Sequence, residues 1–217
     1  MVRFLDTTGS IVHNVLSALT SITNKHSCRE YTVLNDIATA LYGLLKPVEE
    51  VRYIVSRDNL ESIIHTILEA HGVGGHYSEV LERIKDQRLV AVSTVFYPLL
   101  VLEIALNPLE DNILTNSQLV DINEYKLCIP KLEYLIAKLI SMKLYPYNIY
   151  GYTLFFTWLN TEKLDFKLLV ELLKISNVNL REVVSEIENM SNYLQLFKPQ
   201  KLEKSLLEFK SLVFSVM

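Results

Sequence analysis

VEEVRYIV, residues 48–55, is the stretch that decides the predicted fold. Its apolar second half predicts a buried strand over residues 51–56. Because side chains alternate between the two faces of a strand, Glu50 and Arg52 share one face. The question is why a cation stands beside a carboxylate on a strand that is otherwise typical of a protein core.

Before this strand, the sequence predicts a helix, a strand and a second helix. Ser10 can cap a helix that runs to about residue 23, and a short strand follows at residues 29–34. Asn35 or Asp36 can cap the next helix, which Gly43 brings to an end. The strand of the opening stretch completes this unit.

After this strand, further helices and strands are expected. Asp58 or Asn59 can cap a helix with the apolar period i, i+3, i+4, i+7, i+8. Residues 89–106 predict two paired strands, and NPLEDN at 107–112 predicts a turn. From Pro130 onward, every segment has the helical apolar period. The predicted class is α+β, with a mixed β-sheet flanked by helices and then a helical C-terminal half.

The composition is typical of a folded protein with a substantial core. Half of the 217 residues are hydrophobic, and Gly and Pro are scarce. Cys28 and Cys128 stand far apart in the sequence and belong to no CxxC pair or Cys/His cluster. We therefore expect neither a metal–thiolate site nor a disulfide, and a reducing cytoplasm fits this pattern.

Charge and hydropathy argue against two classes of partner. The net charge is −4 and no Lys/Arg-rich run is present, so DNA binding is not indicated. The longest apolar stretch, at 89–106, is interrupted by Pro98 and contains Glu103, which favours paired strands over a membrane span. The N-terminus has no pattern of a signal peptide, and we expect a cytoplasmic protein without membrane attachment.

VLNDIATALYG at 33–43 and VEEVRYIV together resemble the beginning of the DNA polymerase β-like nucleotidyltransferases. The likeness is to their small prokaryotic branch, which includes the AbiEii-type toxins, and continues in IPKLEYLIAKLIS and LNTEKLDFKLLVELL. It covers about residues 30–176. The resemblance implies a nucleotidyltransferase-like α/β core at 1–129 and a helical domain at 130–217 packed on it.

The resemblance also implies where metal ions would bind. In the family, two carboxylates at alternate positions of one strand and a third on a neighbouring strand hold divalent cations. These positions fall on Glu50, Arg52 and Glu103. Because an arginine has only donors, it cannot ligate a cation, and we expect it to pair with Glu50 or Glu103 instead. The alternative is an Arg52 near the strand end that reaches solvent.

The family's phosphate-binding turn is also altered. Its two small residues correspond here to Asn35 and Asp36, and a carboxylate at this place repels a triphosphate. The family's lysine position holds Leu139, beside Lys138. Lys138 is a weak candidate for nucleotide binding, because its polar stripe favours a solvated side chain.

Farther along the chain, an aromatic segment from Tyr145 to Trp158 stands where the family has polar residues. Its rings suit a partner interface or a base-stacking platform, but packing between the sheet and the helical half explains them with fewer assumptions. The candidate partner-binding residues are Tyr147, Tyr150 and Tyr152. Homodimerisation or a protein partner is therefore one expectation for this segment.

Three hypotheses about function follow from these patterns. The first is a nucleotidyltransferase-fold protein without catalysis that acts as a binding or regulatory protein, in a toxin–antitoxin setting or elsewhere, with at most weak nucleotide binding and no cofactor. The second is an active enzyme with unusual ligands that transfers a nucleoside monophosphate to RNA or protein and needs Mg²⁺. The third is an unrelated α+β interaction protein.

Overall fold

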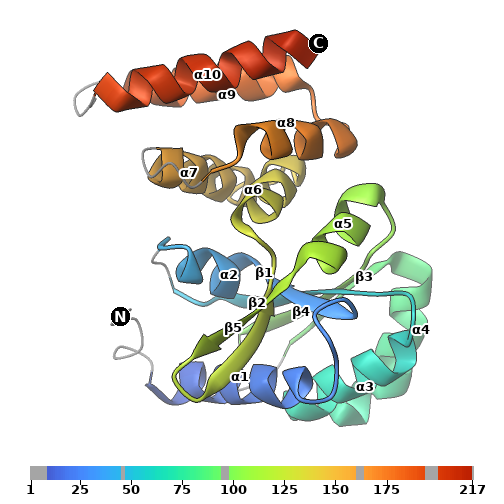
Figure 1. Cartoon of the computed structure of the whole chain (residues 1–217). Coiled ribbons are helices and arrows are strands. Elements are labelled where there is room, and N and C mark those ends of the chain that lie inside the picture. Colours follow the sequence, from blue (N-terminus) through green and yellow to red (C-terminus); the bar gives the residue numbers. More distant parts are fainter. Residues whose placement is uncertain (1–8, 45–46, 94–97, 160–163, 194–199, 217) are drawn as a thin grey trace. The chain divides into compact units, whose positions relative to one another are not determined.

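The computed structural model describes residues 9–44, 47–93, 98–159, 164–193 and 200–216 (Figure 1). The chain forms two compact units. The first comprises Met1–Leu41 and Leu45–Lys131, and the second comprises Tyr42–Leu44 and Leu132–Met217. The class is α+β, as predicted: strands of a mixed sheet alternate with helices, and helices alone follow.

The first unit contains a four-stranded mixed sheet. Its strands are β1 (Tyr31–Leu34), β2 (Glu50–Val55), β3 (Leu89–Val92) and β4 (Leu99–Ile104), in the order β1-β2-β4-β3. β2 and β4 are parallel, whereas β1 pairs antiparallel with β2 and β3 pairs antiparallel with β4. The parallel pair at the centre has an antiparallel strand on each side.

Helices lie on both faces of this sheet (Figure 1). They are α1 (Gly9–Thr23), α2 (Asn35–Leu41), α3 (Leu60–Ala70), α4 (Tyr77–Gln87) and α5 (Pro108–Asn116), with a short 3-10 turn at Gly74–His76. On the face covered by α1 and α3, the hydroxyl of Tyr31 bonds Thr23 and that of Tyr53 bonds His71. Both tyrosines are fully buried, so this face forms the hydrophobic core.

A separate hairpin completes the first unit. It consists of β5 (Gln118–Ile122) and β6 (Tyr125–Ile129), which pair antiparallel. β6 lies against α1 and β1, since Thr32 Oγ1 donates to the carbonyl of Cys128 at 3.1 Å and Thr23 Oγ1 to that of Lys126 at 3.0 Å. The sequence did not predict this hairpin.

The expected turn at 107–112 is wrong, because α5 begins there. The side chain of Asn107 caps the helix by accepting from the backbone N–H of Glu110 at 3.0 Å, and Pro108 stands at the first helical position. Asn, Pro and Asp are common in turns. However, an Asn that is followed directly by Pro, with a Glu three positions after the Asn, is also typical of the start of a helix. In this chain the pattern starts helix α5.

The expectation of no disulfide is also wrong. Cys28 and Cys128 are bonded, with their Cα atoms 5.1 Å apart. Cys28 lies in the connection between α1 and β1, and Cys128 lies in β6. Spacing along the sequence could not indicate this pair, because the packing of β6 against α1 and β1 brings the two cysteines together.

The second unit is helical in its described residues. Its helices are α6 (Leu132–Ser141), α7 (Tyr147–Leu159), α8 (Phe166–Ile175), α9 (Leu180–Tyr193) and α10 (Gln200–Val216). Phe209 is fully buried, and its ring centroid lies 5.0 Å from that of Phe155 and 5.9 Å from that of Phe166. Throughout the described chain, no helix has the length and apolar character needed to cross a membrane.

Candidate functional site

The candidate site lies on the second face of the mixed sheet, where β2 and β4 run side by side. In their parallel register, Arg52 is the partner of Val101. Glu50 precedes Arg52 by two residues, and Glu103 follows Val101 by two, so the three charged side chains lie on the same face. The predicted placement of Glu103 beside Glu50 and Arg52 is confirmed.

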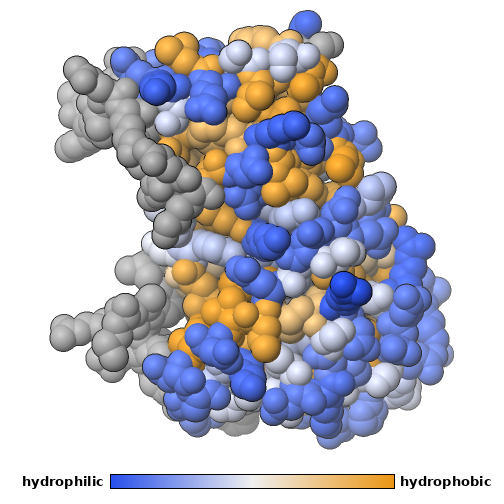
Figure 2. All heavy atoms as spheres, viewed as in Figure 1, coloured by the Kyte–Doolittle hydropathy of each residue, from blue (hydrophilic) through white to orange (hydrophobic). Residues whose placement is uncertain are grey.

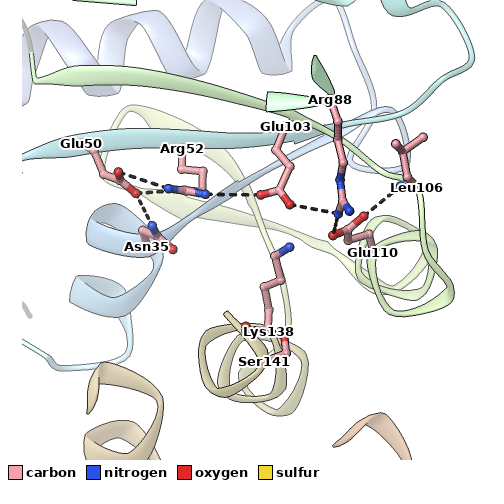
Figure 3. Close-up of polar contacts among 9 residues, drawn as sticks. All are labelled: Asn35, Glu50, Arg52, Arg88, Glu103, Leu106, Glu110, Lys138 and Ser141. Carbon is pink, nitrogen blue, oxygen red and sulfur yellow. Dashed lines mark hydrogen bonds and ion pairs between the residues drawn. The ribbon is translucent and has the colours of Figure 1, made fainter. Parts of the chain in front are cut away.

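The guanidinium of Arg52 lies between the carboxylates of Glu50 and Glu103 (Figure 3). Its Nε donates to Oε1 of Glu50 at 3.0 Å and its Nη2 to Oε2 of Glu50 at 3.5 Å. Its Nη1 donates to Oε2 of Glu103 at 3.4 Å. Arg52, Glu50 and Glu103 are only 6%, 7% and 5% exposed, so the predicted ion pair is present and the solvent-exposed alternative is wrong.

The line of charges continues from Glu103 to α5 (Figure 3). Arg88 Nη2 donates to Oε1 of Glu103 at 3.2 Å and also forms an ion pair with Oε1 of Glu110. Oε2 of Glu110 accepts from the backbone N–H of Leu106 at 2.8 Å. We call Glu50, Arg52, Glu103, Arg88 and Glu110 the carboxylate–arginine row.

All six carboxylate oxygens of the row accept hydrogen bonds or ion pairs from the protein itself. Asn35 and Arg52 bind Glu50, Arg52 and Arg88 bind Glu103, and Arg88 and the backbone of Leu106 bind Glu110. Three glutamates and two arginines leave the row with a formal charge of −3 + 2 = −1. Charge-assisted bonds of this kind compensate much of the cost of burying ions.

The first two residues of α2 are tied to the start of β2. Asn35 has a φ of 50°, a left-handed conformation that Asn tolerates, and its Nδ2 donates to Oε1 of Glu50. Oδ2 of Asp36 accepts from the backbone N–H groups of Glu49 at 2.7 Å and Glu50 at 2.9 Å. The side chain of Asp36 therefore holds the start of β2, a role that the sequence did not indicate.

The opposite face of β2 has a buried pair that titrates abnormally. The hydroxyl of Tyr53 lies 2.6 Å from Nε2 of His71. Burial lowers the pKa of His71 to about 4 and raises the pKa of Tyr53 well above its ordinary value. His71 therefore stays neutral at physiological pH and contributes to the core.

The remaining predicted residues belong to the second unit. Lys138 of α6 is buried, so the expectation of a solvated lysine is wrong. Every residue of Leu132–Ile140 is buried, whereas an amphipathic pattern predicts that one face of the helix is exposed. The hydroxyl of Ser141 donates to the Lys138 carbonyl at 2.7 Å (Figure 3).

The aromatic segment is divided between core and surface. Tyr152 is buried, and desolvation raises its pKa to about 12, so its ring is not part of an exposed surface. Tyr147 and Tyr150 are half-buried. Hydrophobic residues reach the surface over the helices of this unit (Figure 2), and Leu144 and Tyr145, at the entrance to α7, are 60% and 80% exposed.

Arg88 and Glu110 are the site residues that sequence reasoning missed. Glu110 is three residues after Asn107, which indicates a helix start but not an ion pair. Arg88 follows α4 with a φ of 66°, and nothing in its local sequence indicates Glu103 as a partner.

In the part of the chain that the structure describes, no group of three or more His, Cys, Asp or Glu side chains is arranged to hold a metal ion. Comparison with known proteins finds no family model that matches the chain and no matching curated protein.

Proposed function

We propose that this chain is a nucleotidyltransferase-fold protein of the DNA polymerase β-like type that acts by binding and not by catalysis. The observation that carries the proposal is the guanidinium of Arg52, which lies between Glu50 and Glu103 on adjacent parallel strands. In this interpretation, an internal cation occupies the place that metal ions take in active relatives.

The chemistry of the row supports a non-catalytic role. Metal-assisted nucleotidyl transfer needs carboxylate oxygens that are available to divalent ions. Here, the six oxygens of Glu50, Glu103 and Glu110 already accept bonds from protein donors. A divalent ion would have to displace the buried guanidinium of Arg52, or the partly exposed one of Arg88, from its carboxylate partners.

The start of α2 supports binding of a protein rather than a nucleoside triphosphate. A phosphate-binding turn presents free backbone N–H groups to the anion. Here the start of α2 has Asn35, which bonds to the side chain of Glu50, and Asp36, which bonds to the backbone of Glu49 and Glu50, and the carboxylate of Asp36 repels phosphate. The expected ligand of this regulatory protein is therefore a protein partner or a second copy of the chain.

Thermal unfolding with Mg²⁺ or Mn²⁺ and each nucleoside triphosphate tests the proposal. A ligand that binds only the folded state raises the melting temperature. We expect no metal-dependent rise, and no transfer of radiolabel from an α-labelled nucleotide to RNA or to the protein. Transfer, or a rise of several degrees that requires both metal and nucleotide, would contradict the proposal.

Arg52→Asp sharpens this test, because it restores a carboxylate at the second family position. We expect weak gain of divalent-cation binding, measured by calorimetry, and still no nucleotide transfer, since Asn35 and Asp36 remain at the start of α2. Lys85→Asp is the matched control: it makes the same charge change at an exposed position of α4, paired only with surface Glu61 in the contacts described.

A further inference from the structure

The disulfide between Cys28 and Cys128 is a covalent feature that the proposed function does not use. It joins the connection between α1 and β1 to strand β6. The two cysteines are 100 positions apart, and the loop that the bond closes contains all four strands of the mixed sheet and the whole carboxylate–arginine row. Opening this bond therefore frees a loop that contains most of the first unit.

Contacts that do not involve sulfur hold the two cysteines together. Thr32 Oγ1 donates to the carbonyl of Cys128 at 3.1 Å, and Thr23 Oγ1 donates to the carbonyl of Lys126 at 3.0 Å. The backbone N–H of Lys126 donates to Thr20 Oγ1 at 3.0 Å. Because none of these bonds involves sulfur, we expect them to keep the two thiols adjacent when the disulfide is open.

The two cysteines differ in their access to solvent. Cys128 is completely buried, whereas Cys28 is half-buried. Cys28 is therefore the end of the bond that lies nearer to solvent. Thiol–disulfide exchange requires access to only one of the two sulfur atoms.

We propose that Cys28 and Cys128 form a reversible thiol–disulfide switch that fixes the β5–β6 hairpin to α1 and β1. A glutathione thiolate attacks the sulfur of Cys28, the bond to Cys128 breaks, and Cys128 leaves as a thiolate that takes up a proton. A second glutathione thiolate attacks the mixed disulfide, which releases Cys28 and forms oxidised glutathione. Two glutathiones thus supply the two electrons, and oxidised glutathione reverses the reaction.

The hairpin is the element that responds to the switch. Among the described strands, β5 pairs only with β6, and Gln118, Leu119 and Asp121 are exposed. β5 thus has few packing contacts of its own and follows β6. In the reduced protein, hydrogen bonds and apolar packing alone hold β6, so local opening of residues 118–129 becomes more frequent.

A glutathione series tests the switch on the full chain. Folded protein is equilibrated at several ratios of reduced to oxidised glutathione, alkylated, and analysed by mass spectrometry. We expect one transition between zero and two alkylated thiols while the far-UV circular dichroism stays folded. In the reduced form, the melting temperature should fall by roughly 10 °C, and hydrogen exchange should accelerate at 118–129.

Cys28→Ser and Cys128→Ser should match the reduced wild type in melting temperature and show no dependence on the glutathione ratio. If either variant fails to fold, the alkylation series on the wild-type protein still tests whether the disulfide opens reversibly. Two outcomes overturn the proposal: thiols that become available only after unfolding in guanidinium, which indicates a permanent bond, and two free thiols at every ratio, which indicates no bond.

Discussion

At the scale of single residues, Arg52 joins the carboxylates of Glu50 and Glu103. Its planar guanidinium donates through two nitrogens to Glu50 and through a third to Glu103. A lysine ammonium could supply the charge but not this fork of donors. The side chain therefore fixes two strands at once, since Glu50 and Arg52 belong to β2 and Glu103 belongs to β4.

Removing Arg52 takes away the guanidinium that bonds to Glu50 and to one oxygen of Glu103, whereas the ion pair of Glu103 with Arg88 remains. We expect Arg52→Met to lower the free energy of unfolding by about 3–5 kcal/mol, because breaking a buried ion pair leaves its partner uncompensated. Arg52→Lys should lose less, since it keeps the charge. Urea denaturation followed by circular dichroism measures both.

A triple variant provides the matched control for this prediction. Arg52→Met combined with Glu50→Gln and Glu103→Gln removes the unpaired charges, and most of the lost stability should return. An Arg52→Met protein as stable as the wild type would show that the row contributes nothing to stability.

His71 makes the stability of the protein depend on pH. Its pKa is about 4 in the folded protein, against 6.5 for an ordinary histidine, because burial disfavours the charged ring. Between these pH values the unfolded chain binds a proton that the folded protein does not. Stability is therefore unaffected above pH 6.5 and falls as pH decreases toward 4, by about 3 kcal/mol in all.

His71→Gln tests this dependence, since glutamine does not titrate. The difference in unfolding free energy between wild type and variant should shift in favour of the variant as pH falls from 6.5 to 4. The titration of the carboxylates cancels in this difference in unfolding free energy, because both proteins contain the same carboxylates. His65→Gln, at an exposed position of α3, is the control. A difference that stays constant across this pH range would refute a neutral, buried His71.

At the scale of elements, α6 and α7 approach each other closely at Gly151. A Cβ atom at this position would lie 2.8 Å from Cγ1 of Ile140 and 3.0 Å from the Ile140 backbone nitrogen. The close packing of α6 therefore leaves no room for a side chain at position 151. The hydrophobic pattern of α7 did not show this, since apolar and aromatic residues occupy most of YNIYGYTLFFTWL and mark no single face.

Gly151→Ala should therefore destabilise the protein, although alanine is the better helix former. Helix propensity alone predicts a gain of about 1 kcal/mol. Overpacking against a backbone atom costs about 1–3 kcal/mol, and we expect this cost to exceed the gain. Thr157→Ala, at an exposed position of the same helix, should be neutral or stabilising. Thermal unfolding compares the two, and a more stable Gly151→Ala protein would exclude the close approach.

Local patterns predicted most elements but not their long-range partners. The pairing of Arg52 with Glu50 could be predicted because residues two apart share a face of a strand. Its pairing with Glu103 also required the parallel register of β2 and β4. Arg88 could not be found, because its contacts depend on where the chain turns after α4.

At the scale of the whole molecule, the same distinction explains the disulfide and the hairpin. Cys28 and Cys128 meet because β6 packs on α1 and β1, and no pattern within either segment contains this information. The change from mixed strands and helices to helices alone is different, since it is visible in the sequence near Pro130. Composition changes at such a boundary, whereas a contact between distant residues leaves no local pattern.

Each unit has a buried core of its own, so damage should remain largely within the unit that receives it. Phe209→Ala removes a fully buried ring that packs on Phe155 and Phe166, all in the second unit. We expect hydrogen exchange to accelerate more in α7, α8 and α10 than in β2 and β4, and Arg52→Met to give the reverse pattern. Phe214→Ala, at a 60% exposed position of α10, is the matched control and should change neither region. Equal acceleration across both units after either substitution would show that the chain unfolds as one cooperative body.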